Sequence, residues 1–280
     1  MARSHSGVAP PAQRDIDDIV AAVRASGRDA LFEHEVYAVL ASAGFEVPRH
    51  FVWSGDPAEA PEGALAAFLD ALPARRVVLK IVSSQILHKS DVGGLAFAER
   101  TVDAVRATAV GLWADVSARA PGAERAGILV SEMLSSMGGS PASETLVSAR
   151  LDPAFGPVLV LGLGGVLTEW FGALSDGRST LILRPGRVRE TLVRAADRLP
   201  AMGLLFRQSR LHAKPPLDLE RTAERLEALG RAAELFAELE VNPLLTTPDA
   251  RWVAVDGKAR LAGPAPVPRS SPPLAKIAKL

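Results

Sequence analysis

The apolar positions of the first 126 residues recur mainly at the spacing of an amphipathic helix. Residues 16–23 carry an apolar side chain every three or four positions, and Gly27 follows as a stop signal, so this stretch predicts a helix. Three more helices are expected on similar grounds: one that Asp29 caps and Gly44 ends, one that Pro73 closes, and a long one that begins near Thr101.

Strands dominate from Gly127 onward. Apolar runs predict strands at 127–134, 144–150 and 157–163, helices around 187–198 and 219–237, and a closing strand pair at 237–245 and 251–259. The order lacks the regular strand–helix–strand repeat of a doubly wound sheet, so we expect an α+β fold with two lobes. The predicted organisation is N-terminal helices with a first lobe over 15–126, a second lobe over 127–262, a disordered tail at 1–14 and a Pro-rich tail at 263–280.

Composition narrows the class of protein. The 280 residues are 48% hydrophobic and carry no net charge, so there is no general basic surplus for nucleic acid or anionic membrane. The chain has no cysteine, which excludes disulfides, thiolate metal sites and cysteine nucleophiles. No secretory signal is visible, and no apolar run approaches the roughly 20 residues of a membrane span. A cytoplasmic protein is expected.

One strand carries a lysine where only apolar residues are expected. Lys80 interrupts the apolar run 77–82, and a buried ammonium group is unfavourable unless it meets an anion. The polar loop 88–94 (HKSDVGG) follows, and a loop of Lys, Ser and two glycines offers a cation and backbone N–H groups to phosphate. The alternative is an edge strand whose lysine extends to solvent, followed by a solvated turn.

Oxygen-bearing side chains mark a second candidate site. Glu240 and Asn242 share one face of a predicted strand, and Asp256 arrives from its partner strand, so their oxygens suit a hard cation such as Mg²⁺. Glu132 and Glu144 end or begin other strands and are candidates for contacts to a base and a ribose. The alternative is a solvated strand face for Glu132 and Glu144, and a polar edge hairpin for the cation site.

Taken together, the motifs resemble a known family. HKSDVGG, FGPVLVLGLGG (155–165) and ELEVNPL (238–244) resemble, in order and spacing, the ATP-grasp β subunit of ADP-forming acyl-CoA synthetases. This is the acetate–CoA ligase group, related to the succinyl-CoA synthetase β chain. The resemblance covers nearly the whole chain outside its two tails and implies a two-lobed ATP-grasp fold with N-terminal helices.

The resemblance also implies roles for individual residues. Contacts to the nucleotide are implied for Lys80, Lys89, Ser90, Gly93, Gly94, Glu132, Met133, Leu134, Ser135, Glu144, Gly164 and Gly165. Magnesium is implied at Asn242 and Asp256, with Glu240 nearby. In some members a histidine of the LHKSD loop relays phosphate, and His88 occupies that position, which makes it the catalytic candidate.

The implied reaction converts acyl-CoA, ADP and phosphate into a carboxylic acid, CoA and ATP. Its cofactors would be ATP or ADP with Mg²⁺. No G-x-G-x-x-G follows a strand here, so CoA would bind a separate α subunit, and a hetero-oligomer is expected.

Two alternatives remain from the residues. The family often has a phenylalanine–arginine pair shortly before a proline after the Gly loop. Here that segment reads STLILRP (179–185), and the missing arginine near Ile182 favours a regulatory ATP-grasp module without ligase activity. A stand-alone carboxylate–amine ligase would need neither histidine nor CoA. The sequence does not identify the acid.

Overall fold

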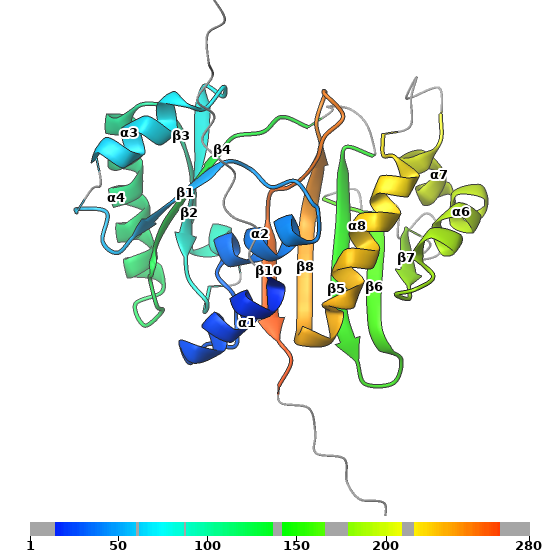
Figure 1. Ribbon diagram of the computed structural model, residues 1–280. Coiled ribbons are helices and arrows are strands. Elements are labelled where there is room, and N and C mark those ends of the chain that lie inside the picture. Colours follow the sequence, from blue (N-terminus) through cyan, green and yellow to red (C-terminus); the bar gives the residue numbers. More distant parts are fainter. Residues whose placement is uncertain are drawn as a thin grey trace, which may run out of the picture.

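The computed structural model describes residues 15–59, 62–86, 88–136, 142–165, 179–208 and 216–263. The predicted tail 1–14 and all but the first residue of the predicted tail 263–280 lie outside these ranges. Two antiparallel sheets stand side by side, with helices on their outer faces (Figure 1). This arrangement confirms the expected α+β fold with two lobes. None of the helices in the described ranges is long and apolar enough to cross a membrane.

The first sheet has four strands in the order β1-β4-β2-β3. They are β1 (His50–Ser54), β2 (Arg76–Val82), β3 (Leu95–Glu99) and β4 (Gly127–Glu132). Helices α3 (Glu62–Asp70) and α4 (Val102–Arg119) cover its outer face (Figure 1). Helix α4 begins where the sequence predicts, and the side chain of Thr101 caps it. Because facing residues of paired strands share a side, the opposite face, which carries Lys80 and Leu129, turns toward the second sheet.

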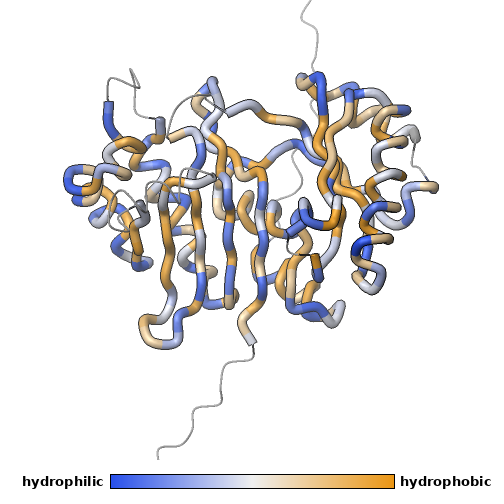
Figure 2. Tube along the Cα trace, turned by 180° about the vertical axis from the view of Figure 1, so that it is seen from behind, coloured by the Kyte–Doolittle hydropathy of each residue, from blue (hydrophilic) through white to orange (hydrophobic). Residues whose placement is uncertain are grey.

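The second sheet is longer and follows the order β10-β8-β5-β6-β7, with β9 also paired to β8. Its strands are β5 (Glu144–Asp152), β6 (Gly156–Leu163), β7 (Thr180–Leu183), β8 (Phe236–Thr246), β9 (Trp252–Ala254) and β10 (Gly257–Leu261). Helices α6 (Val188–Arg198), α7 (Pro200–Phe206) and α8 (Leu219–Arg231) pack against one face. The other face carries polar residues, among them Ser148, Glu238 and Glu240. Figure 2 views the molecule from behind, toward this face.

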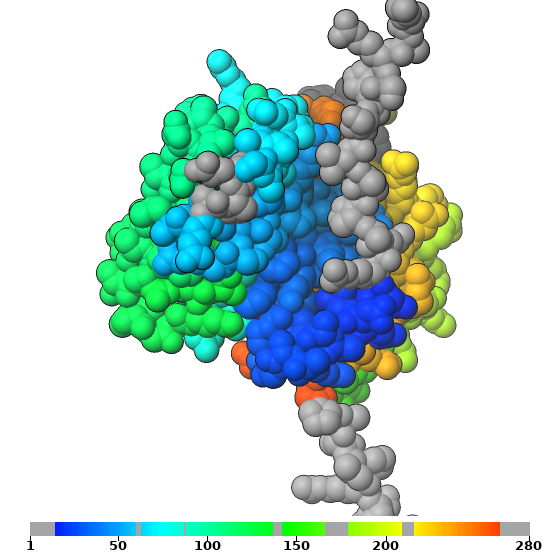
Figure 3. All heavy atoms as spheres, turned by 60° about the vertical axis from the view of Figure 1, so that its left-hand side comes forward, coloured from blue at the N-terminus to red at the C-terminus, as the bar shows by residue number. Residues whose placement is uncertain are grey.

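The lobe boundaries predicted at 15–126 and 127–262 are wrong in two respects. Strand β4 pairs with both β1 and β2, so the first sheet extends to Glu132 and the crossing between sheets comes after it. Helices α1 (Ile16–Ala25) and α2 (Glu33–Ser42) share the core of the second sheet. The reason is the apolar face of α2: Val36 packs so closely on β10 that a Cβ at Gly257 would lie 2.8 Å from its methyl group. Figure 3 shows both helices between the two lobes.

One helix prediction also needs correction, and one helix was not predicted. The helix expected over 219–237 ends at Arg231, because Phe236 is already the fully buried first residue of β8. Helix α7 follows α6 almost directly and was not predicted, since the seven residues Pro200–Phe206 are too few to show a period.

The closing hairpin contains an irregularity that matters for the site. Strand β10 pairs with β8 up to Val241, and β9 pairs with β8 from Leu244. Between these stretches the Val255–Asp256 segment faces Asn242–Pro243, with the Asn242 N–H donating to the Asp256 carbonyl at 3.2 Å. The register is the same on both sides, so Val255 and Asp256 form a short break in the regular pairing without an inserted residue.

The core of the second sheet yields a stability prediction. Leu161 of β6 is fully buried, whereas Ile182 on the adjacent β7 is 70% exposed. Leu161→Ala should lower the free energy of unfolding by about 2–5 kcal/mol, because it leaves a cavity. Ile182→Ala is the matched control and should change it by less than about 0.5 kcal/mol. Urea unfolding checks both, and equal losses would contradict this packing.

Candidate nucleotide site between the two sheets

Lys80 lies in the middle of β2 with its side chain only 6% exposed. Its Nζ donates to Glu33 Oε1 at 2.5 Å and to the Val255 carbonyl at 2.6 Å. The anion that a buried lysine requires is therefore supplied by the protein itself, from helix α2. The carbonyl belongs to the Val255–Asp256 segment of the second sheet, so one ammonium group joins three separate parts of the chain.

Glu33 also binds the second lysine of the predicted phosphate loop. Lys89 Nζ lies 3.0 Å from Glu33 Oε2, so the two carboxylate oxygens each face one ammonium group. The Tyr37 hydroxyl, one turn further along α2, donates to Glu33 Oε1 at 2.5 Å and lies 3.0 Å from the Val255 carbonyl oxygen. The Glu33 side chain is 3% exposed, which makes this a buried ionic cluster.

Opposing effects set the protonation states in this cluster. Burial alone would raise the pKa of Glu33, but the charges of Lys80 and Lys89 and the bonds from Lys80 and Tyr37 lower it below its ordinary value. Burial would likewise lower the pKa of Lys89, yet the charges of Glu33 and Asp256 raise it. Glu33 and Lys89 are therefore both ionised at neutral pH. Burial and the Glu33 charge raise the pKa of Tyr37 well above its ordinary value.

The predicted phosphate loop is a compact turn beside these lysines. Residues Lys89–Val92 form the 3-10 turn η1, which Gly93 closes with a left-handed φ of 70°. At Gly94 a Cβ would lie 2.7 Å from the Ile81 side chain, so only glycine lets the loop return to the sheet this closely. A pocket opens over the turn, and its lining residues are Lys80, His88, Lys89, Ser90, Asp91, Leu95 and Asp256.

The predicted metal residues continue this site on the second sheet. Asp256 is half exposed, and its Oδ1 lies 3.9 Å from both Lys80 Nζ and Lys89 Nζ. Its backbone accepts from the Asn242 N–H, and Asn242 Oδ1 in turn accepts from the Gly165 N–H at 3.1 Å. Glu144 lies against the same glycine, where any Cβ would collide with its carboxylate. A continuous line of polar groups thus runs from the lysines to Glu144.

Other predicted residues lie apart from this line. Glu240 and Glu238 face Lys258 of β10, whose Nζ lies 3.6 Å from Glu240 Oε1. Among the residues the structure describes, no three His, Cys, Asp or Glu side chains lie close enough to hold a metal ion together. A bound cation would therefore depend on Asp256, Asn242 and further oxygens from a ligand.

Glu132 has a structural role in this conformation. Its carboxylate accepts from the Arg49 N–H at 2.9 Å, and its partner Val77 belongs to the core under α3 and α4. Facing residues of paired strands share a side, so Glu132 lies on the face opposite Lys80. Met133, Leu134 and Ser135 follow at the start of the crossing between the sheets (Figure 1).

Sequence reasoning did not identify Glu33 or Tyr37. Both lie on a helix whose apolar face was recognised, and an acid in the first turn of a helix is a common stabilising feature. The only available signal was indirect: two lysines predicted at one phosphate site need a nearby carboxylate when no ligand is bound.

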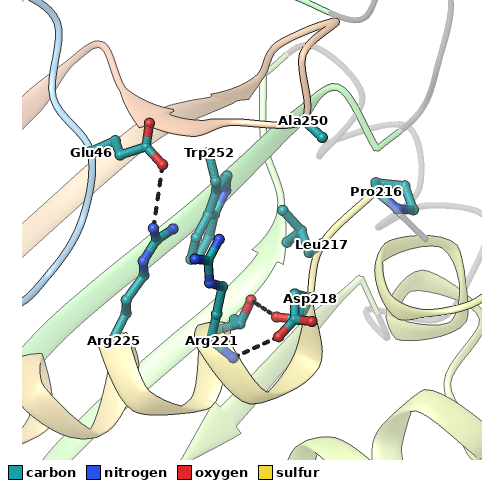
Figure 4. Close-up of a pocket in the computed structure, with 9 residues that line it drawn as sticks. Glu46, Pro216, Leu217, Asp218, Arg221, Arg225, Ala250 and Trp252 are labelled. Atoms are coloured by element: carbon teal, nitrogen blue, oxygen red, sulfur yellow. Dashed lines mark hydrogen bonds and ion pairs between the residues drawn. The ribbon is translucent and has the colours of Figure 1, made fainter. Parts of the chain in front are cut away.

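A second pocket lies elsewhere, between the start of α8 and strand β9 (Figure 4). Of its charged side chains, those of Glu46, Asp218 and Arg225 are already used by the fold. Arg225 pairs with Glu46 at 3.4 Å, and the Asp218 carboxylate caps α8 by accepting from the Arg221 N–H at 2.8 Å. None of the predicted site residues lines this pocket.

Tyr37 is the single tyrosine of the chain, so its ionisation can be observed directly. The folded protein should keep this phenol proton at pH values where the urea-unfolded chain, with an ordinary pKa of about 10, has lost it. The stability that the neutral phenol contributes is complete below about pH 10 and is lost as the pH rises toward the folded-state pKa. Phenolate absorbance measures this, and a signal near pH 10 from protein still folded by circular dichroism would contradict the burial.

Relatives of known activity cover most of this chain. It is 29% identical over 226 residues to the 4-hydroxybutyrate–CoA ligase (ADP-forming) of Nitrosopumilus maritimus, a match over 80% of this chain. The chain spans only 29% of that protein. It is 25% identical to the β subunit of acetate–CoA ligase (ADP-forming) II of Pyrococcus furiosus, over 88% of this chain and 97% of that subunit.

A solved structure and a family comparison agree with these relatives. The dinucleotide-forming acetyl-coenzyme A synthetase 1 of Ca. Korarchaeum cryptofilum, in complex with coenzyme A, Ca-AMPCP and HgCl+, superposes with a TM-score of 0.71 at 29% identity. The match covers 89% of this chain and 100% of that one. The family described as ATP-grasp domain matches residues 22–261. The predicted resemblance is confirmed, and the chain belongs to the ATP-grasp family.

Proposed function

We propose that this chain is the nucleotide-binding part of an ADP-forming acyl-CoA ligase. The observation that carries the proposal is the pair of ammonium groups beside Asp256, buried Lys80 and partly buried Lys89, on a pocket between the sheets. Two cations and a glycine turn suit the phosphates of ADP or ATP. The names of the relatives, which are CoA ligases that form ADP, support the reaction type.

The residues present also fit Mg²⁺. Asp256 and Asn242 offer a carboxylate and an amide oxygen from adjacent positions of the hairpin, and a hard cation prefers such oxygens with phosphate oxygens completing its shell. The bound cation would offset negative charge on the phosphates. Lys80 and Lys89 would do the same from the first sheet, while Gly164 and Gly165 hold Asn242 and Glu144 in place.

The remaining chemistry requires a second component. The chain spans less than a third of the N. maritimus ligase but almost the whole of a P. furiosus β subunit. We infer that a CoA-binding α subunit completes the enzyme as a hetero-oligomer. The acyl phosphate would form on that partner, because none of the residues in our candidate site is assigned to CoA.

His88 is the proposed phosphate carrier of this chain. It lines the same pocket as Lys80, Lys89 and Asp256. In the proposed relay the bond between phosphorus and the carboxylate oxygen of the acyl phosphate breaks as a bond to an imidazole nitrogen forms. That bond then breaks as a terminal oxygen of ADP takes the phosphoryl group.

A regulatory module that binds nucleotide without transferring phosphate is the second candidate. The family arginine is absent at Ile182, and the structure places this side chain on an edge strand with 70% exposure. The two candidates agree on nucleotide binding and differ on phosphoryl transfer.

Calorimetric titration with ADP tests the nucleotide site. Asp256→Asn should weaken binding of Mg-ADP at least about tenfold while leaving metal-free ADP binding no weaker, because the variant removes an anionic cation ligand but not the lysines. Asp249→Asn is the matched control, since Asp249 pairs with Arg251 in the hairpin turn. Equal Mg-ADP affinity in wild type and Asp256→Asn would contradict the metal assignment.

His88→Asn separates the two candidates. With the CoA-binding partner added, wild type should form ATP from acyl-CoA, ADP and phosphate, and the variant should lose at least about 100-fold in rate because no carrier nitrogen remains. ADP affinity should change less than about threefold. Full activity of His88→Asn would exclude the relay, and inactivity of the wild-type complex would favour the regulatory module.

A further inference from the structure

Glu33 is the most completely enclosed charge of the site, and it is shared between the two lysines that the proposed function uses. It comes from α2, whereas Lys80 lies on β2 and Lys89 on the turn η1. Its carboxylate is 3% exposed, against 52% for Asp256, the other acid near these ammonium groups. Water screens Asp256 but not Glu33, so Glu33 provides the stronger compensation for the lysine charges.

Glu33 and an incoming phosphate would face the two lysines from different sides. The pocket is lined by both lysines and by Asp256, but Glu33 is not among its lining residues. The carboxylate therefore lies behind the ammonium groups, on the side of α2, while a phosphate would arrive from the pocket. An anion in this position orients the lysines without occupying the place of the ligand.

We propose that Glu33 is a positioning residue of the nucleotide site, holding Lys80 and Lys89 toward the pocket before any nucleotide binds. This inference rests on the proposed function and adds to it a residue that does not contact the ligand. Tyr37 supports the arrangement, because its hydroxyl fixes Glu33 Oε1 and approaches the Val255 carbonyl that also holds Lys80.

The predicted phosphate loop also depends on the contact between Lys89 and Glu33. Lys89 is the first residue of η1, and its carbonyl accepts from the Gly94 N–H at 2.7 Å, which closes the loop. Without the Glu33 charge, two ammonium groups would face each other with only the exposed Asp256 between them. Lys89 lies on a single 3-10 turn, whereas Lys80 is held within the paired strand β2, so a displacement of Lys89 would move the phosphate loop with it.

The test compares Glu33→Gln, which keeps the shape and removes the charge, with Glu35→Gln on the same helix. Glu35 pairs with Arg28 at 2.7 Å and touches neither lysine, so it controls for damage to α2. The probes are Mg-ADP and inorganic pyrophosphate, titrated calorimetrically into the full-length chain. Glu33→Gln should weaken both about 10- to 100-fold, since charge-assisted bonds to the lysines are lost. Glu35→Gln should change neither more than about threefold.

A double-variant cycle shows whether the effect passes through the lysine. In a Lys89→Gln background, the further loss caused by Glu33→Gln should shrink to about a third or less of its size in wild type. A purely structural role would weaken binding equally in both backgrounds. Unchanged or tighter binding by Glu33→Gln would overturn the proposal, the latter by showing that Glu33 competes with phosphate.

Two further comparisons cover the cases in which Glu33→Gln does not fold or the wild-type chain does not bind the probes. If Glu33→Gln does not fold, Glu33→Asp retains the charge and withdraws it by one methylene, and it should still weaken Mg-ADP at least about fivefold; wild-type affinity would overturn the proposal. If the wild-type chain binds neither probe, the proposed function fails. Binding by wild type with no effect at Glu33 refutes the positioning role alone.

Discussion

The structure around the pocket depends on one constraint: a buried and a partly buried lysine lie side by side and need an anion that is buried with them. Glu33 meets this need, with one carboxylate oxygen for each lysine. Breaking a buried ion pair by removing one partner is strongly destabilising, typically about 3–5 kcal/mol, because the other charge is left uncompensated. The contact therefore fixes where α2, β2 and the turn η1 meet.

The second sheet contributes through an interruption of its regular pairing. Where Asn242–Pro243 separates the two paired stretches of β8, the opposing Val255–Asp256 segment lies beside the lysines of the first sheet. Val255 offers its carbonyl to Lys80, and Asp256 offers its carboxylate to both lysines. Pro243 has no N–H to donate to the facing Val255 carbonyl, so this carbonyl accepts from Lys80 instead.

Much of this could be predicted from the sequence where the signal was local. Lys80 in an apolar strand, the glycine turn and the acidic hairpin were each recognisable from neighbouring residues, and the structure brings them together around one pocket. Other features depend on partners that lie far away in the sequence. The role of Glu33 depends on lysines that lie 47 and 56 positions away in the sequence. The strand register decides that the Glu132 carboxylate accepts from the Arg49 N–H. The lobe boundary was misplaced because β4 finds its partners earlier in the chain.

Helix α2 belongs to the core of the second sheet, yet its Glu33 holds lysines of the first. The two sheets are thus joined by charges at the point where a ligand would enter. Any rotation that opens the pocket between the sheets must separate Lys80 and Lys89 from both Glu33 and Asp256. The electrostatic interactions in the pocket therefore change with the angle between the lobes. A polyanion that replaces these contacts changes the free energy of opening as well as its own binding.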